Sequence, residues 1–144
     1  MPDVARAILL VEDSDDDVLF FKRAIKLADV ANPVMRVSSG EEAIAYLTGE
    51  GQYADRTAFP MPFAVMLDLR LPGTQGLEVL KWIRSQPQLN KIFVAVLSGN
   101  EQGAVIEETL DSGANKFLSK PCKPAELRTL TEEFPGEWQT SLPA

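Results

Sequence analysis

Five side chains could carry chemistry, because each lies at or just beyond the end of a short apolar run of the kind that forms buried strands. They are three carboxylates, a hydroxyl and an ammonium: Glu12, Asp13, Asp68, Ser98 and Lys120. Carboxylates that share a pocket repel one another by roughly 4 kcal/mol per close pair at an effective dielectric near 20. A raised pKa or a bound hard cation such as Mg²⁺ relieves that repulsion. With a lysine beside them, these groups suit a phosphoryl anion, which an aspartate can accept as an oxygen nucleophile.

The chain contains no histidine. This excludes Ser-His-Asp and Cys-His nucleophile pairs, histidine-ligated zinc and a phosphohistidine of the chain's own. The single cysteine, Cys122, cannot form an internal disulfide, and we interpret it as a loop residue without a redox role. Any chemistry is therefore expected to depend on carboxylates, hydroxyls and lysine.

Short apolar runs predict five strands that alternate with helical patterns. This alternation is typical of a doubly wound α/β fold, in which a five-stranded parallel sheet with right-handed crossovers carries helices on both faces. Ligands bind such sheets at the carboxyl ends of the strands, so the five candidate side chains are expected to converge there. The predicted strands are 7–11, 33–37, 63–67, 92–97 and 116–118.

The first predicted helix starts after Ser14, which can serve as its N-cap. Asp15, Asp16 and Asp17 follow in its first turn, where the helix dipole favours negative charge. We interpret these three carboxylates as solvated. Residues 48–62, rich in glycine and proline, predict a long surface connection that is either functional or a tolerated insertion.

Composition limits the class of protein. A length of 144 residues fits one domain, and 45% hydrophobic with 24% charged residues is ordinary for a globular chain. With 14 basic and 21 acidic residues the net charge is −7, which disfavours direct binding to nucleic acid. We find no apolar run of the ~20 residues that a membrane span requires, and no signal peptide. We therefore expect a cytoplasmic protein that does not contact a membrane.

Taken together, these motifs resemble the receiver domain of two-component response regulators. The acidic pair follows the first strand, Asp68 precedes Leu71-Pro72-Gly73, Ser98 precedes Gly99, and Lys120 precedes Pro121. The resemblance covers about residues 6–134, with 1–5 and 135–144 as short terminal extensions. It implies a flavodoxin-like sheet with strand order 2-1-3-4-5.

The resemblance also implies a role for each site residue. Asp68 would accept a phosphoryl group from the phosphohistidine of a sensor histidine kinase, giving an aspartyl phosphate. Asp13, Asp68 and the backbone carbonyl of Arg70 would ligate Mg²⁺, with Glu12 acting partly through water. The protein would then be a phosphoacceptor in signalling, and would catalyse only its own phosphoryl transfer and hydrolysis.

Three further residues would respond to the phosphoryl group. Lys120 would pair with it, Ser98 would donate a hydrogen bond to it, and Phe117 would be the aromatic residue that switches. Phe117 stands where tyrosine is common, and it lacks a hydroxyl, so its switching would depend on burial alone. The surface of the fourth helix, fifth strand and fifth helix would change on phosphorylation and could form a homodimer.

A narrower resemblance concerns partners. The long connection at 48–62 and the acidic run at 12–17 are similar to those of stand-alone receivers associated with bacterial phytochromes, so the kinase could be a phytochrome. The signal would leave by contact with a downstream protein or by phosphorelay to another histidine.

Three alternatives differ from this interpretation. A phosphatase of the haloacid dehalogenase type would need a second aspartate two residues after Asp68, where Arg70 stands. A flavodoxin-type flavin protein would need a glycine- and hydroxyl-rich loop in place of the acidic run at 12–17. A receiver-like scaffold that is never phosphorylated usually lacks the acceptor or the lysine, and both are present here.

Overall fold

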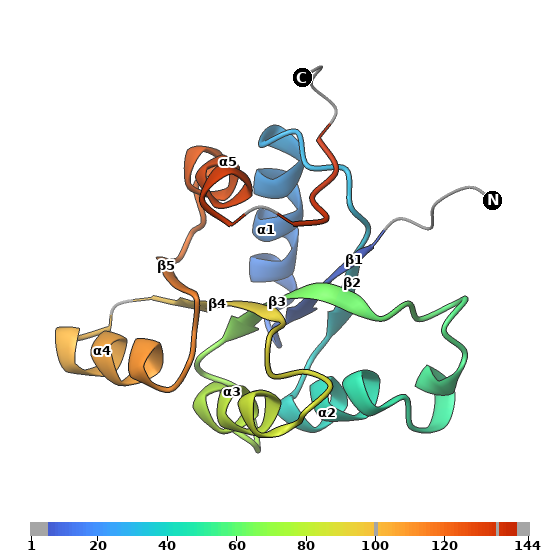
Figure 1. The fold of residues 1–144 in the computed structure, drawn as a ribbon. Helices are drawn as coiled ribbons and strands as arrows, with labels where there is room; N and C mark the ends of the chain where they lie inside the picture. Colours follow the sequence, from blue (N-terminus) through green and yellow to red (C-terminus); the bar gives the residue numbers. More distant parts are fainter. Residues whose placement is uncertain (1–5, 100, 135, 141–144) are drawn as a thin grey trace.

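The computed structural model of the protein describes residues 6–99, 101–134 and 136–140. All five predicted strands form one parallel sheet in the order β2-β1-β3-β4-β5, which confirms the expected fold class (Figure 1). The strand bounds agree with the sequence prediction to within a residue or two. They are β1 Ala7–Val11, β2 Val34–Val37, β3 Pro62–Asp68, β4 Phe93–Ser98 and β5 Lys116–Ser119.

Helices cover both faces of the sheet. Figure 1 shows α1 and α5 on one face and α2 and α3 on the other, with α4 beside β5. In the part of the chain that the structure describes, none of the helices is long and apolar enough to cross a membrane. The helices are α1 Asp15–Leu27, α2 Gly40–Thr48, α3 Gly76–Ser85, α4 Gly103–Asp111 and α5 Pro124–Glu133.

The central strands are buried on both sides, as expected for a parallel sheet between two helical layers. Along β1, Leu9 and Val11 belong to the apolar cluster under α2 and α3, whereas Ile8 and Leu10 belong to the cluster under α1 and α5. All residues of β1 are inaccessible to solvent. The rigidity of this two-sided core fixes the positions at which the strands end.

A close approach of backbone to backbone fixes the turn after β3. The amide of Gly76 donates to the carbonyl oxygen of Leu69 at 3.1 Å. A Cβ atom at Gly76 would collide with the carbonyl oxygen of Asp68, so only glycine permits α3 to start this close to the strand end. The side chain of Asp68 is thereby held at the edge of the sheet.

The connection from 48 to 62 is more ordered than the sequence pattern indicates. It contains a short 3-10 helix, Gly51–Ala54, and its Tyr53 is buried. The rings of Tyr53 and Phe59 lie 5.1 Å apart edge to face, and both contact Tyr46 of α2. The expectation of a mere surface connection was therefore incomplete, because these aromatic residues anchor the segment in the core.

Residues 136–140 pack along the sheet end opposite the carboxyl ends of the strands. The buried side-chain amide of Asn32 donates to the carbonyl oxygens of Arg6 and Glu137 at 2.8 and 2.9 Å, and its oxygen accepts from the amide of Gln139. The indole ring of Trp138 stacks edge to face on Phe63, with 4.9 Å between centroids. These contacts tie the segment after α5 to the amino-terminal side of the fold.

Candidate functional site

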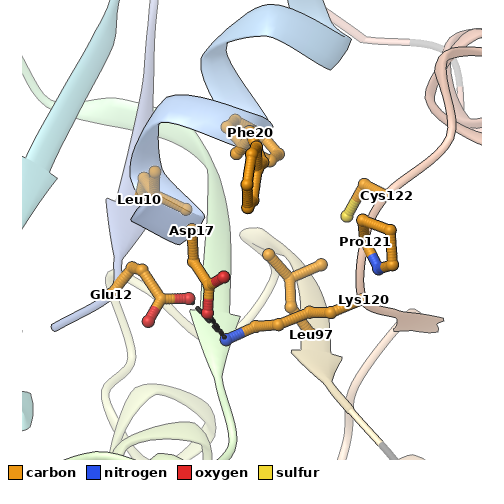
Figure 2. Close-up of a pocket in the computed structure, with 9 residues that line it drawn as sticks. Leu10, Glu12, Asp17, Phe20, Leu97, Lys120, Pro121 and Cys122 are labelled. Atoms are coloured by element: carbon orange, nitrogen blue, oxygen red, sulfur yellow. Dashed lines mark hydrogen bonds and ion pairs between the residues drawn. The ribbon is translucent and has the colours of Figure 1, made fainter. Parts of the chain in front are cut away.

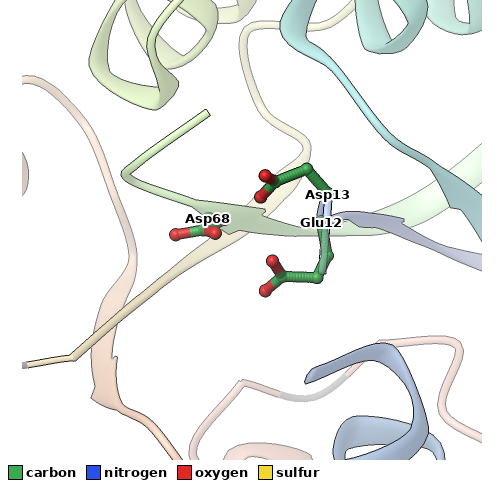
Figure 3. Close-up of side chains that lie close together, drawn as sticks. All are labelled: Glu12, Asp13 and Asp68. Carbon is green, nitrogen blue, oxygen red and sulfur yellow. The ribbon is translucent and has the colours of Figure 1, made fainter. Parts of the chain in front are cut away.

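Three carboxylates meet at the carboxyl end of the sheet. Glu12 and Asp13 follow β1 and Asp68 ends the neighbouring strand β3, and one oxygen from each lies within 4.8 Å of the others (Figure 3). Glu12 and Asp68 are buried, whereas Asp13 is exposed. The cluster is therefore open to solvent on one side, and its oxygen donors match those that hard divalent cations prefer.

Lys120, between β5 and α5, reaches into this cluster. Its Nζ atom lies 2.6 Å from Glu12 Oε1, 3.0 Å from Asp68 Oδ2 and 3.1 Å from Asp17 Oδ2. Figure 2 shows the lysine extended beneath Glu12 and Asp17. An ammonium has three protons to donate, and here each has a carboxylate acceptor.

Burial shapes the charge of this group. Burial raises the pKa of Glu12 to about 7; the hydrogen bond from Lys120 offsets part of that rise, and the nearby charge of Asp68 adds to it. Burial lowers the pKa of Lys120, but its hydrogen bonds to Glu12, Asp68 and Asp17 outweigh this and raise the pKa above its usual value. Lys120 is thus a fixed cation surrounded by more negative charge than it can neutralise.

Asp17 belongs to the site, although the sequence interpretation placed it among solvated carboxylates. Its amide binds the Ser14 Oγ atom at 3.3 Å, which confirms Ser14 as the helix cap, and its carboxylate binds Lys120. Asp15 follows the solvated pattern more closely, since its side chain is 90% exposed and pairs with Arg36. The difference arises because the third residue of the helix faces the sheet edge while the first faces solvent.

Arg36 of β2 supports the corner that carries the acidic pair. Its Nε atom donates to the carbonyl oxygen of Glu12 at 2.9 Å, and its Nη2 atom donates to that of Asp13 at 3.2 Å. Sequence reasoning did not identify this residue. A lone arginine in a strand carries no pattern that links it to a corner 23 residues away.

Ser98 ends β4 and is buried, but its hydroxyl binds a residue outside the acidic cluster. Its Oγ atom donates to Glu101 Oε2 at 2.8 Å. Glu101 also accepts two hydrogen bonds from the guanidinium of Arg70, at 2.6 and 3.1 Å. Hydrogen bonds from Arg70 and Ser98 hold the pKa of Glu101 below its usual value. Sequence reasoning missed Glu101, which lies in a loop without a distinctive motif.

Arg70 adjoins the acidic cluster, and Phe117 lies on β5 against the apolar core. The amide of Arg70 donates to Asp68 Oδ1 at 3.0 Å, so the backbone of this residue adjoins the acidic group. Phe117 is half-buried on β5 and packs against the same apolar cluster as Val105 of α4. Its partner in the sheet register is Val96, two residues before Ser98.

An apolar pocket of about 200 Å³ opens next to Lys120. Figure 2 shows Phe20 of α1 above it and Pro121 and Cys122 at its side. Burial raises the pKa of the Cys122 thiol to about 12, so it stays protonated near neutral pH. A second hollow of about 300 Å³ continues from Phe20 to Leu27, both of which are exposed.

Comparisons with known proteins agree with this geometry. Residues 8–132 match the family model of the response regulator receiver domain. The response regulator Rcp1 of Synechocystis is 29% identical over 141 residues, which cover 96% of this chain and 94% of Rcp1.

Solved structures also align over nearly the whole chain. The phosphorylated cyanobacterial phytochrome response regulator RcpA superposes with a TM-score of 0.78 at 31% identity, covering 96% of this chain and 100% of RcpA. The Mn²⁺-bound form of Rcp1 superposes with a TM-score of 0.76 at 27% identity, covering 96% of this chain and 99% of Rcp1.

These findings bear on one of the alternatives raised by the sequence. The family match gives no support to the phosphatase of the haloacid dehalogenase type, and Arg70, in the position that its second aspartate would need, is paired with Glu101. The oxygen donors of the acidic cluster fit a divalent metal. The chain resembles the phytochrome response regulators. It belongs to the response regulator receiver family, whose members are phosphoacceptors in two-component signalling.

Proposed function

We propose that Asp68 is the phosphoacceptor of this receiver and that a sensor histidine kinase is the donor. The observation that carries the proposal is the position of Asp68 within the acidic cluster, with one oxygen 3.0 Å from Lys120 Nζ and the other 3.0 Å from the Arg70 amide. These donors hold the carboxylate in one orientation. Each carboxylate oxygen retains a further lone pair, so the group can still act as a nucleophile.

The reaction needs positioning more than covalent assistance from the protein. An oxygen of Asp68 attacks the phosphorus of the phosphohistidine, a P–O bond forms, and the P–N bond breaks with its electron pair returning to the imidazole. The product is an aspartyl phosphate. Lys120, held as a cation by its neighbours, would exchange a carboxylate for a phosphoryl oxygen. The protein would catalyse only its own phosphorylation and the hydrolysis of its aspartyl phosphate. Hydrolysis would return it to the unphosphorylated state.

The metal we propose is Mg²⁺. Glu12, Asp13 and Asp68 supply carboxylate oxygens, and the backbone carbonyl of Arg70 would complete the protein's ligand set. The bound cation would neutralise charge on the phosphoryl oxygens during transfer. A relative with the same fold binds Mn²⁺, which supports a divalent cation at this site.

The kinase would approach over α1. A phosphohistidine must reach Asp68 past the rim of the site, and the rim beside Lys120 is apolar. Phe20 is 49% exposed and Leu27 is 63% exposed, and both line the hollow that continues from this rim. Exposed apolar side chains beside a reaction centre are suited to a protein partner. Because relatives are named as phytochrome response regulators, a bacterial phytochrome is the proposed kinase.

The output surface would be the face formed by α4, β5 and α5. Ser98 precedes α4 and Phe117 lies on β5, so both border this face. A hydroxyl drawn toward a phosphoryl group would leave room for Phe117 to turn inward. The changed face would then bind a downstream protein, a phosphotransfer histidine domain or a second copy of the chain. Because the kinase makes its phosphohistidine from ATP, we expect these events in the cytoplasm.

The first prediction concerns the acceptor. Incubation with acetyl phosphate and Mg²⁺ should add one phosphoryl group to the native chain, measured as intact mass. Asp68→Asn and EDTA should each abolish the addition. Labelling that persists in Asp68→Asn would show that another residue is the acceptor.

The second prediction concerns the metal. A cation that binds the folded chain but not the unfolded chain stabilises the folded state. Mg²⁺ at 100 times its dissociation constant should therefore raise the free energy of unfolding by about 2.7 kcal/mol. The rise, measured as a thermal midpoint, should be much smaller in Asp13→Ala. Asp16→Ala removes an equal charge from an exposed neighbouring position and should respond like the native chain. Equal rises in both variants would place the cation elsewhere.

A third prediction separates kinase docking from chemistry. Phe20→Ala should slow phosphoryl transfer from the kinase about tenfold or more, since truncating a central interface aromatic typically costs above 1.4 kcal/mol. Transfer from acetyl phosphate should be unchanged. Leu19→Ala is the control, because Leu19 is 53% exposed on the same helix but is not among the residues that line either hollow. If the kinase transfers its phosphoryl group to Phe20→Ala as fast as to the native chain, the proposed docking surface is contradicted.

The fourth prediction tests the output face. Beryllofluoride, a phosphoryl mimic, should alter amide exchange in α4 and β5 and shift self-association, measured by sedimentation, by ~5- to 150-fold. Phe117→Ala should remove this shift. Phe63→Ala, at the other end of the sheet, should retain it. Exchange that changes only in the loops beside Asp68 would contradict the proposed route.

A further inference from the structure

The hydroxyl of Ser98 is already committed to an acceptor. It donates to Glu101 Oε2 at 2.8 Å, and both partners are shielded: Ser98 is 1% exposed, and the Glu101 side chain is 7% exposed. Such a bond between a hydroxyl and a carboxylate is charge-assisted and stronger than a neutral one. The bond therefore lies at the border of the site, with Ser98 enclosed and Glu101 shielded through its side chain.

The hydroxyl of Ser98 cannot keep this bond and also donate a hydrogen bond to a phosphoryl group. A serine hydroxyl has one proton, and an ionised carboxylate can only accept. The oxygens of a phosphoryl group on Asp68 would likewise act as acceptors. Ser98 can therefore serve Glu101 or the phosphoryl group with its single proton, but not both.

Arg70 fixes the position of Glu101. Its guanidinium binds both carboxylate oxygens of Glu101, at 2.6 and 3.1 Å. The Arg70 side chain is 67% exposed, so solvent screens the pair and its own contribution to stability is small. Its effect is geometric, because the fork holds the carboxylate where the Ser98 hydroxyl meets it. The same residue donates its amide to Asp68, which links this network to the proposed acceptor.

We propose that Glu101 is a positioning residue that competes with the phosphoryl group for the Ser98 hydroxyl and so favours the unphosphorylated arrangement of the receiver. This inference rests on the proposed function, in which Asp68 takes the phosphoryl group and Ser98 binds it. Glu101 itself does not touch the reacting atoms. It acts through Ser98, because the hydrogen bond between Ser98 and Glu101 must break before Ser98 can bind the phosphoryl group. The free energy of that bond is subtracted from the binding of the phosphoryl group.

The test is the affinity for beryllofluoride with Mg²⁺, measured by calorimetry on the full chain. Glu101→Gln keeps the shape but weakens the acceptor, and Glu101→Ala removes it. Affinity should rise in the order native, Glu101→Gln, Glu101→Ala, with a total gain of ~5- to 150-fold, the usual range for coupling between sites. Glu107→Gln removes a charge from an exposed position of α4 and should match the native chain.

A second background shows whether Glu101 acts through Ser98. In Ser98→Ala the same Glu101 substitutions should leave the affinity unchanged, because no hydroxyl is left to release. Two outcomes would overturn the inference if the native chain binds the mimic. One is a gain in affinity that persists in Ser98→Ala, and the other is that the Glu101 variants bind beryllofluoride no more tightly than the native chain. A native chain that neither binds beryllofluoride nor takes a phosphoryl group from acetyl phosphate would overturn the proposed function and this inference with it.

Discussion

The site depends on one ammonium placed among carboxylates. Lys120 donates to Glu12, Asp68 and Asp17, and Asp13 lies beside them without a contact to the lysine among the described ion pairs. One cation cannot neutralise all of this negative charge. Burial raises the pKa of Glu12, and the nearby charge of Asp68 adds to the rise that the hydrogen bond from Lys120 partly offsets. In the proposed function, a divalent cation would relieve the remaining imbalance, and the cation and Lys120 together would offset the negative charge of the phosphoryl group.

The sheet makes this arrangement possible. A parallel sheet brings the ends of β1, β3, β4 and β5 to one edge, so groups more than a hundred residues apart in the chain share one pocket. Strands buried on both faces cannot slide without exposing their apolar residues, which fixes the register. Gly76 and Arg36 complete the frame, one by allowing α3 to start against Asp68, the other by binding the carbonyls of the β1–α1 corner.

The surroundings of the site divide into two regions with different chemistry. Toward α1 and α5 the rim is apolar, with Phe20 and Pro121 beside Lys120. Toward α4 it is polar, where Ser98, Glu101 and Arg70 form one hydrogen-bonded network. In the proposed function, the apolar side would contact the protein that delivers the phosphoryl group. The polar side would respond to the phosphoryl group, since the single hydroxyl proton of Ser98 binds either Glu101 or a phosphoryl oxygen.

The sheet was predictable from the amino-acid sequence, because apolar runs of strand length alternate with helical periods and each run ends in a polar residue. It also predicted that Glu12, Asp13, Asp68 and Lys120 lie together, since the ends of parallel strands share one edge of the sheet. Ser98 ends a strand at the same edge, but its hydroxyl binds Glu101. Which acceptor each donor binds could be seen only in the folded chain. Asp17, Arg36 and Glu101 carry no periodic pattern, and their contacts depend on side-chain directions and distances between segments far apart in the chain. The same reason applies to Asn32 and Trp138, whose partners exist only after the chain has closed around its core.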